Sequence, residues 1–280
     1  MTVERMKFLS VLVVVVLQLF ANKASADINT GARGVRPVQV NALDGSTFVY
    51  PESHALLIGN TQYESEVWPD LINIKKELEQ VKLALEDQEF LIYKDKIQFD
   101  LKGNELRRLI REFIAKNGIT RDSRQNRLLI YYSGHGETLN GVGYLVPVDA
   151  PSKSNAAEFY LRAIPMTDVQ TWSRQIQAQH VLFIFDSCFS GTIFESRSST
   201  EVPPGISALT AKPVRAFLTA GEAGQTVPAK SEFTPLLVQG IRGAADLGKK
   251  DGYITASELY VYLHPSYVYP LYPGRAKLTY

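Results

Sequence analysis

The stretch VLFIFDSCFSG, residues 181–191, decides the fold and raises the first question about function. It begins as an unbroken apolar run, which is typical of a strand buried on both faces of a parallel sheet. The run stops at Asp-Ser-Cys, and Cys188 is the only cysteine in the chain. A single thiol has no internal partner for a disulfide, so it is either a small buried apolar side chain or a reactive group.

Further apolar runs and amphipathic stretches alternate on both sides of this segment. The runs predict strands over residues 54–59, 90–93, 127–132, 144–148, 181–185 and 215–219. Apolar residues at helical spacing, with turn residues at the ends, predict helices over 71–85, 100–118, 167–178, 234–241 and 255–263. This alternation predicts an α/β fold with a mostly parallel six-stranded sheet and helices on both faces.

The N-terminus carries the pattern of a secretory signal peptide. Arg5 and Lys7 precede a largely apolar run over residues 8–20, and Ala24-Ser-Ala26 follows it. The run is shorter than the ~20 apolar residues of a spanning helix. We therefore expect residues 1–26 to be removed and the protein to be exported, to the periplasm or beyond the cell, without an integral membrane span. An uncleaved anchor is the alternative.

The remaining chain is expected to hold an extended lead-in (27–53), one domain (54–263) and a proline-rich tail (264–280). Lys and Arg total 30 against 29 Asp and Glu, and no basic block interrupts the sequence, so nucleic acid is not an expected partner. The histidines outside the 133–137 segment show no spacing for zinc, and no metal is expected. Trp172 is expected to belong to the core. The oligomeric state is left open.

Chemically capable residues follow two of the predicted strands. Ser133-Gly-His-Gly-Glu137 follows one strand, and Asp186-Ser-Cys188 follows the other. Functional sites in open α/β sheets form beyond the carboxyl ends of the strands. If the two strands are neighbours, His135 faces Cys188 and can take its proton. The backbone N–H groups of Gly136 and Cys188 would then form an oxyanion hole.

These segments resemble the caspase/metacaspase superfamily of cysteine peptidases, in its bacterial, metacaspase-like branch. The resemblance rests on YYSGHGE (131–137), GYLVPVD (143–149) and FDSCFSG (185–191). Weaker support comes from 55–60, 218–221, 233–237 and 251–259, so that it covers roughly residues 54–263. It implies a caspase-like three-layer sandwich, with His135 as general base and Cys188 as nucleophile.

The resemblance also implies a specificity. In metacaspase-like enzymes, an aspartate at the position of Asp186 lines the first substrate pocket and selects Arg or Lys. The second pocket acid of the family aligns with Glu77, next to Lys76, and this departure puts its role in doubt. A strand-end cap is the alternative for Asp186, and a solvated helix residue is the alternative for Glu77.

The sequence thus predicts an exported cysteine endopeptidase that uses a Cys-His dyad, acts on peptide or protein substrates and cleaves after Arg or Lys. A catalytically silent caspase-like binding or assembly module is the alternative, and acyl transfer on the same dyad stays open. No cofactor is expected. Some metacaspases need calcium, which acidic residues after the fourth strand bind. In this sequence the only acidic residue directly after the fourth predicted strand is Asp149, so calcium activation is an open but unsupported alternative. We also hypothesise self-cleavage after Arg197, in the Ser- and Thr-rich segment 189–213.

Overall fold

A seven-stranded sheet forms the centre of the protein in the computed structural model, which describes residues 18–21, 38–41, 47–187, 214–220, 233–247, 253–263 and 277–279. The strand order is β14 (Lys277–Thr279), β12 (Val214–Thr219), β11 (His180–Asp186), β7 (Arg127–Ser133), β4 (Ser53–Gly59) and β5 (Leu91–Ile92), and β6 (Gln98–Phe99) also pairs with β4. Every pairing in this sheet is parallel except that of β12 with β14. The predicted parallel sheet is confirmed, with seven strands rather than six.

Both faces of the sheet are buried, which explains the unbroken apolar runs. In β7, Leu129 and Tyr131 face one core, while Leu128, Ile130 and Tyr132 face the other. None of these five side chains is more than 1% exposed. Burying each one contributes roughly 1.5–3 kcal/mol, so polar residues in these strands would be costly except at the strand ends.

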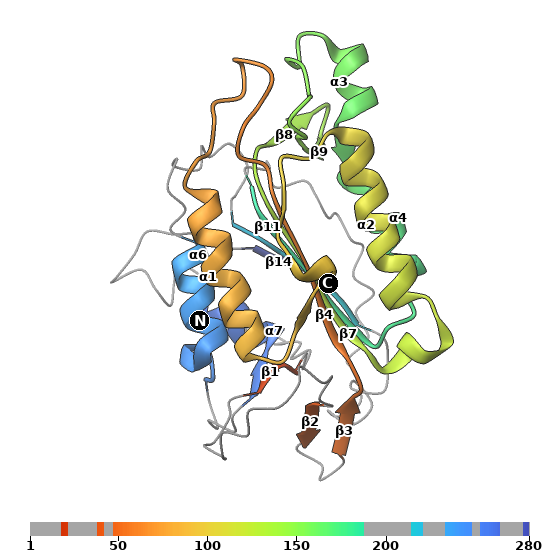
Figure 1. Cartoon of the computed structure of the whole chain (residues 1–280), viewed down its shortest axis with the longest axis vertical. Helices are drawn as coiled ribbons and strands as arrows, with labels where there is room; N and C mark the ends of the chain where they lie inside the picture. Colours follow the sequence, from red (N-terminus) through yellow and green to blue (C-terminus); the bar gives the residue numbers. More distant parts are fainter. Residues whose placement is uncertain are drawn as a thin grey trace, which may run out of the picture.

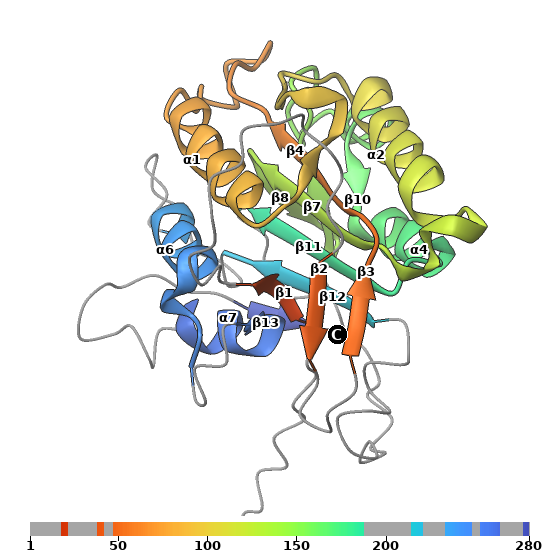
Figure 2. The ribbon, with the colours of Figure 1, turned by 60° about the horizontal axis from the view of Figure 1, so that its bottom comes forward.

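Helices cover the two faces in separate layers (Figures 1 and 2). One layer contains α1 (Ile74–Asp87), α6 (Phe233–Gln239) and α7 (Ala256–Leu263), and the other contains α2 (Gly103–Gly118) and α4 (Met166–Gln175). Each helix turns an apolar stripe to the sheet, because its apolar residues recur at helical spacing. The predicted three-layer α/β sandwich is therefore confirmed. Short turns complete this part of the chain: η1 (Tyr93–Asp95), η2 (Arg121–Gln125) and the π-helical η3 (Gly240–Ala244).

A small second sheet lies beyond the carboxyl ends of the central strands. It contains β8 (Gly136–Leu139), β9 (Val142–Leu145) and β10 (Ile164–Pro165), and α3 (Ala156–Arg162) precedes β10. The prediction of a main-sheet strand over 144–148 is wrong, because β9 pairs antiparallel with β8 and β10. Asn140 and Gly141 have φ values of 52° and 77° and make the two-residue turn that folds β9 back onto β8.

The segments before β4 form short strand pairs. β2 (Val38–Asn41) and β3 (Thr47–Tyr50) pair antiparallel within the predicted lead-in, so that this region holds a strand pair rather than only extended chain. β1 (Gln18–Ala21) pairs with β13 (Tyr253–Thr255) and lies within the predicted signal peptide, which remains a prediction. Among the described residues, no helix is long and apolar enough to cross a membrane.

The start of α2 differs from the prediction. Asp100, the first residue of the predicted range and a residue type that can cap a helix, does not cap α2. Its carboxylate accepts hydrogen bonds from the backbone N–H groups of Thr61 (2.6 Å) and Gln62 (3.0 Å). The helix begins at Gly103, whose N–H donates to Oδ1 of Asp149 at 2.8 Å. Asp149 is distant in sequence, so no local pattern could indicate it as the partner. Asp100 instead fixes the start of the loop that follows β4.

A buried arginine ties the amino ends of the central strands together. Arg127, at the start of β7, is 0% exposed. Its Nε donates to Oγ of Ser53 at 2.7 Å, and one terminal nitrogen donates to the Gln88 carbonyl at 2.7 Å. Its guanidinium also lies 4.5 Å from the ring centroid of Phe90. These contacts link β7 to β4 and to the end of α1 at the edge of the sheet opposite the candidate site.

Candidate active site

The tips of β7 and β11 bring the two predicted catalytic segments together. The strands are parallel neighbours, and Asp186 pairs in register with Ser133. Beyond that pair, the N–H of Gly134 donates to the carbonyl of Asp186 at 3.3 Å. The hydroxyl of Ser187 donates to the carbonyl of Gly134 at 2.8 Å. The residues immediately before His135 and Cys188 are thus hydrogen-bonded to each other, while Cys188 itself lies outside the described residues.

His135 has a defined tautomer. Its Nε2 lies 2.8 Å from the carbonyl oxygen of Pro69. A carbonyl only accepts hydrogen bonds, so Nε2 carries the proton, and Nδ1 of the neutral ring is left with a lone pair. Burial lowers the pKa of His135, and the hydrogen bond to Pro69 opposes that shift only in part. The neutral, proton-accepting form of the ring is therefore favoured.

Aromatic side chains of the loop between β4 and α1 hold His135 in place. The Tyr63 hydroxyl accepts a hydrogen bond from the His135 backbone N–H at 2.8 Å. The imidazole ring centroid lies 4.7 Å from that of Tyr63 and 5.6 Å from that of Trp68. The Trp68 indole N–H donates to the Ala150 carbonyl at 3.1 Å. This loop therefore positions both the backbone and the ring of His135.

Close packing also explains the glycine before His135. A Cβ at Gly134 would lie 2.8 Å from the hydroxyl oxygen of Tyr132 and 3.0 Å from that of Tyr63. Both hydroxyls are held in position. That of Tyr132 donates to the carbonyl of Val146 at 2.9 Å, and that of Tyr63 accepts from the His135 N–H. A side chain here would push His135 away from its supports.

Two buried acidic side chains act on the Tyr131 hydroxyl, on the α1–α6 side of the sheet. Asp186 is 5% exposed, and its Oδ2 accepts a hydrogen bond from the Thr234 hydroxyl of α6 at 2.8 Å. Glu77 of α1 is 9% exposed. Burial, followed by the negative charge of Asp186, raises the pKa of Tyr131 well above its usual value, and Glu77 adds to this shift. Both carboxylates therefore act on the Tyr131 hydroxyl.

Comparison with known proteins places this arrangement in a family. A family model described as "Caspase domain" matches residues 52–245, which is more than half of the chain and includes every residue of the site described above. The chain belongs to the caspase-domain family. No curated protein matches the chain at a significant level.

Two solved structures of insect caspases match the chain. Caspase-1 from Spodoptera frugiperda superposes with a TM-score of 0.50 at 11% sequence identity, over 81% of this chain and 86% of that one. The Drosophila initiator caspase Dronc superposes with a TM-score of 0.47 at 11% identity, over 69% of this chain and 66% of that one. At this identity, the likeness to the Spodoptera caspase shows the fold alone.

The other site residues that the sequence predicts are Gly136, Cys188, Arg197, Glu77 and Asp186. Gly136 opens β8 directly after His135, at the place where an oxyanion donor is expected. Cys188 and Arg197 lie outside the described residues, so the nucleophile, its N–H donor and the self-cleavage point remain predictions. Glu77 is 9% exposed, so its side chain is largely withdrawn from solvent, and its role as a pocket acid remains a prediction. Asp186 contacts α6 through its side chain rather than only ending its strand.

Asp149 is fully engaged within the domain. Its Oδ1 accepts from the Gly103 N–H at 2.8 Å, and its Oδ2 pairs with Arg162 at 2.8 Å. A calcium ion at Asp149 would compete with that guanidinium for the carboxylate. In the described part of the chain, no three His, Cys, Asp or Glu side chains are placed to hold a metal ion.

Tyr63, Trp68 and Pro69 are site residues that the sequence did not indicate. They lie more than 60 positions before His135, in a loop without a recognisable motif, and one of them acts through its backbone oxygen. Hydrogen bonds over long sequence separations, such as those of Asp100 to Thr61 and of Trp68 to Ala150, hold this loop at the strand tips.

Proposed function

We propose that the protein is an exported cysteine endopeptidase that uses a Cys188–His135 dyad and cleaves after Arg or Lys. One observation carries this proposal: His135 sits at the tip of β7 with its Nε2 proton bound to Pro69, which leaves Nδ1 to accept a proton. Cys188 follows the tip of the neighbouring parallel strand, one residue after the bond between Ser187 and Gly134. Membership of the caspase-domain family supports the same chemistry.

The reaction would proceed by acyl transfer to sulfur. The Cys188 thiol gives its proton to Nδ1 of His135, and the thiolate attacks the carbonyl carbon of the scissile bond. The N–H groups of Gly136 and Cys188 would stabilise the negative charge on the carbonyl oxygen. The protonated imidazole then gives its proton to the departing amine. Water, deprotonated by His135, hydrolyses the thioester and restores the thiol.

Selection of a basic residue would come from the acidic pair. Asp186 and Glu77 are both buried close to the Tyr131 hydroxyl, where a substrate guanidinium or ammonium would find two negative charges. A carboxylate binds a guanidinium through two parallel hydrogen bonds, whereas an acidic side chain would be repelled. The proposed partner is therefore a peptide or protein with an accessible Arg or Lys. No cofactor is needed for these steps.

An assay on fluorogenic peptides tests the proposal. The purified chain is given matched substrates that end in Arg, Lys or Asp, with reductant, and with either calcium or a chelator. We expect turnover of Arg and Lys substrates only. Cys188→Ala should lower kcat/KM at least about 10³-fold, and His135→Asn about 10²–10⁴-fold.

His54→Asn is the matched control, because His54 lies on β4 and contacts Glu52 rather than the site. It should retain activity. Turnover of the Asp substrate would refute the proposed pocket, and activity that survives Cys188→Ala would refute the mechanism. No turnover of any peptide by a folded, reduced chain would favour the alternative, a silent module used for binding or assembly.

Self-cleavage after Arg197 is a separate part of the proposal. The intact masses of the wild type and of Cys188→Ala, after incubation with reductant, decide it. We expect fragments that end at Arg197 in the wild type only. Arg197→Gln should then remove the fragments without lowering peptide turnover before processing. The same fragments in both proteins would mean that a contaminating peptidase produced them.

A further inference from the structure

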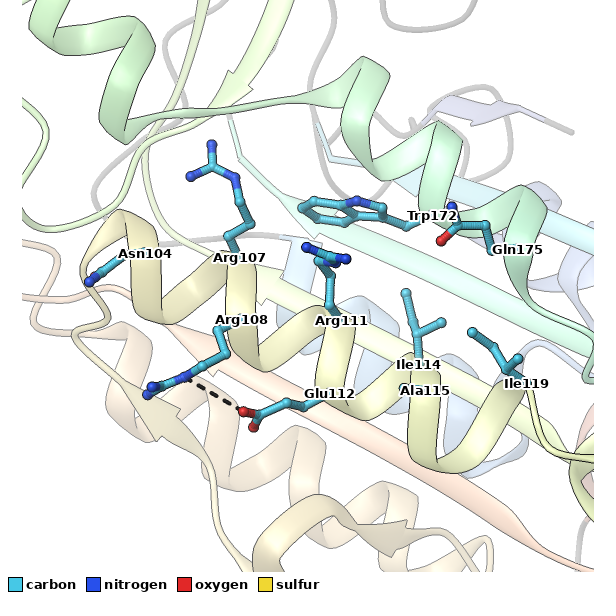
Figure 3. A pocket seen from close by; sticks show the side chains of 10 residues that line it. All are labelled: Asn104, Arg107, Arg108, Arg111, Glu112, Ile114, Ala115, Ile119, Trp172 and Gln175. Atoms are coloured by element: carbon cyan, nitrogen blue, oxygen red, sulfur yellow. Dashed lines mark ion pairs between the residues drawn. The ribbon is translucent and has the colours of Figure 1, made fainter.

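A groove of about 530 Å³ runs between α2 and α4, on the layer of the molecule opposite Asp186 and Glu77 (Figure 3). We call it the α2–α4 groove. One wall of the groove is formed by residues of α2, from Asn104 to Ala115, and by Ile119, which follows the helix. The other wall is formed by Trp172 and Gln175 of α4. Trp172, expected to be core, is 8% exposed and forms part of the wall. None of the side chains that contact His135 lines this groove.

The groove carries excess positive charge. Glu112 is shared by two cations, with Arg108 at 3.6 Å and Lys94 at 3.5 Å from its carboxylate oxygens. Arg107 donates to the neutral carbonyl of Ala163 at 3.2 Å. Within the described residues, no carboxylate pairs with Arg107 or Arg111. The groove therefore presents two guanidinium groups, and no carboxylate among the described residues neutralises either of them.

The placement of these two arginines disfavours the helix rather than stabilising it. Arg107 and Arg111 are one turn apart on α2, and like charges at this spacing destabilise a helix by about 0.2–0.5 kcal/mol. Figure 3 shows both side chains extending to the side on which Trp172 lies, whereas Arg108 points to Glu112. An anion between α2 and α4 would relieve the repulsion.

We propose that the α2–α4 groove binds an acidic peptide segment. Guanidinium groups bind carboxylates through paired hydrogen bonds. The accessible apolar surface beside the arginines comes chiefly from Ile119, which is 36% exposed, since Trp172 and Ile114 are largely buried. The span from Asn104 to Ile119 measures about 22 Å along a helix, which matches six to seven extended residues at about 3.3 Å each. A single nucleotide would fill only part of that length.

The proposal concerns binding and does not depend on peptidase activity, so it is tested in the full chain with Cys188→Ala. The chain has two tryptophans, and adding Trp68→Phe leaves Trp172 as the only one. The probe is a synthetic eight-residue peptide of alternating Glu and Leu, and the matched control replaces each Glu by Gln. We expect a saturable change in Trp172 emission with the Glu peptide, weakened by salt, and none with the Gln peptide.

Titration calorimetry on the chain that retains Trp68 checks binding without the second substitution. Arg107→Gln with Arg111→Gln should weaken the Glu peptide about tenfold or more. Arg121→Gln with Arg124→Gln removes the same charge from exposed residues of η2 outside the groove, and should change affinity less than about twofold. Circular dichroism confirms that both variants fold.

Three results would overturn the proposal. The first is no binding of the Glu peptide at millimolar concentration. The second is equal weakening by the two arginine pairs, which would mean nonspecific attraction. The third is ATP binding to the groove more tightly than the Glu peptide, which would identify a phosphate-bearing small molecule as the ligand.

Discussion

A backbone carbonyl oxygen orients the His135 ring, and this neutral partner affects both the tautomer and the pKa of the ring. The Pro69 carbonyl accepts the Nε2 proton at 2.8 Å, so no carboxylate is needed to set the tautomer. A carbonyl is neutral and does not stabilise the imidazolium as strongly as a carboxylate would. The lowered pKa of His135 follows from burial that this neutral partner offsets only in part.

The first prediction is a low pKa for His135. By NMR on Cys188→Ala, which removes the thiol, His135 should titrate below about 6.5, with its signal assigned by its loss in His135→Asn. The folded state then binds fewer protons than the unfolded state between this pKa and about 6.5, so stability from His135 falls as the pH falls through that window. A pKa above 6.5 would mean that a negative charge, rather than the Pro69 carbonyl, governs the ring.

The second prediction concerns Asp186. Asp186→Asn keeps the size of the side chain and its hydrogen bond with Thr234 but removes the charge. We expect kcat/KM for Arg peptides to fall about 10²-fold or more, because a buried charged partner is lost, and mainly through a higher KM. Asp168→Asn, at a half-buried position in the first turn of α4, is the control. An equal loss of activity with both variants would assign Asp186 no part in specificity.

The sequence predicts some site residues and not others for physical reasons. His135, Cys188 and Asp186 follow apolar strands directly, so strand prediction also places them at the edge of the sheet. Tyr63 and Pro69 reach the site only through folding of a loop, held by the Asp100 carboxylate at a positive φ of 55°. Such contacts across long sequence separations leave no local periodicity.

At the scale of elements, one missed signal was present in the sequence. Residues 144–148 are apolar and predict a strand, but the Asn140-Gly141 pair marks a tight hairpin that makes β9 the partner of β8. The central strands were predicted because parallel strands buried on both faces carry continuous apolar runs. The two-residue strands β6 and β10 are too short to show any period, whereas β5 lies within the apolar run 90–93 that predicts it.

The third prediction tests the arginine that joins the elements. Arg127→Ala removes the bonds to Ser53 and Gln88 and leaves a cavity, so the free energy of unfolding should fall by about 3–5 kcal/mol. Arg127→Met, which keeps much of the volume, should cost less. Arg124→Ala, on an exposed residue, should cost less than about 0.5 kcal/mol. Urea denaturation measures all three, and equal effects of the 127 and 124 variants would contradict this account.

At the scale of the whole molecule, the fourth prediction is removal of the N-terminal leader. Protein recovered outside the cytoplasm should begin at Asp27, as measured by intact mass and N-terminal sequencing. This follows from the basic start, the short apolar run and the Ala-Ser-Ala site. The processed protein would also lack β1, the strand paired with β13. Exported protein that retains Met1 would instead support an anchored form.

The three-layer architecture separates the two proposed recognition surfaces. Asp186 contacts α6 and Glu77 belongs to α1, whereas the α2–α4 groove lies on the layer that covers the other face of the sheet. Neither occupant would obstruct the other. A protein that engaged both would have to curve around the sheet edge, presenting its basic residue and its acidic segment in opposite directions. A short peptide cannot reach both surfaces at once. Assays with short peptides would therefore underestimate the selectivity of the protein among folded substrates.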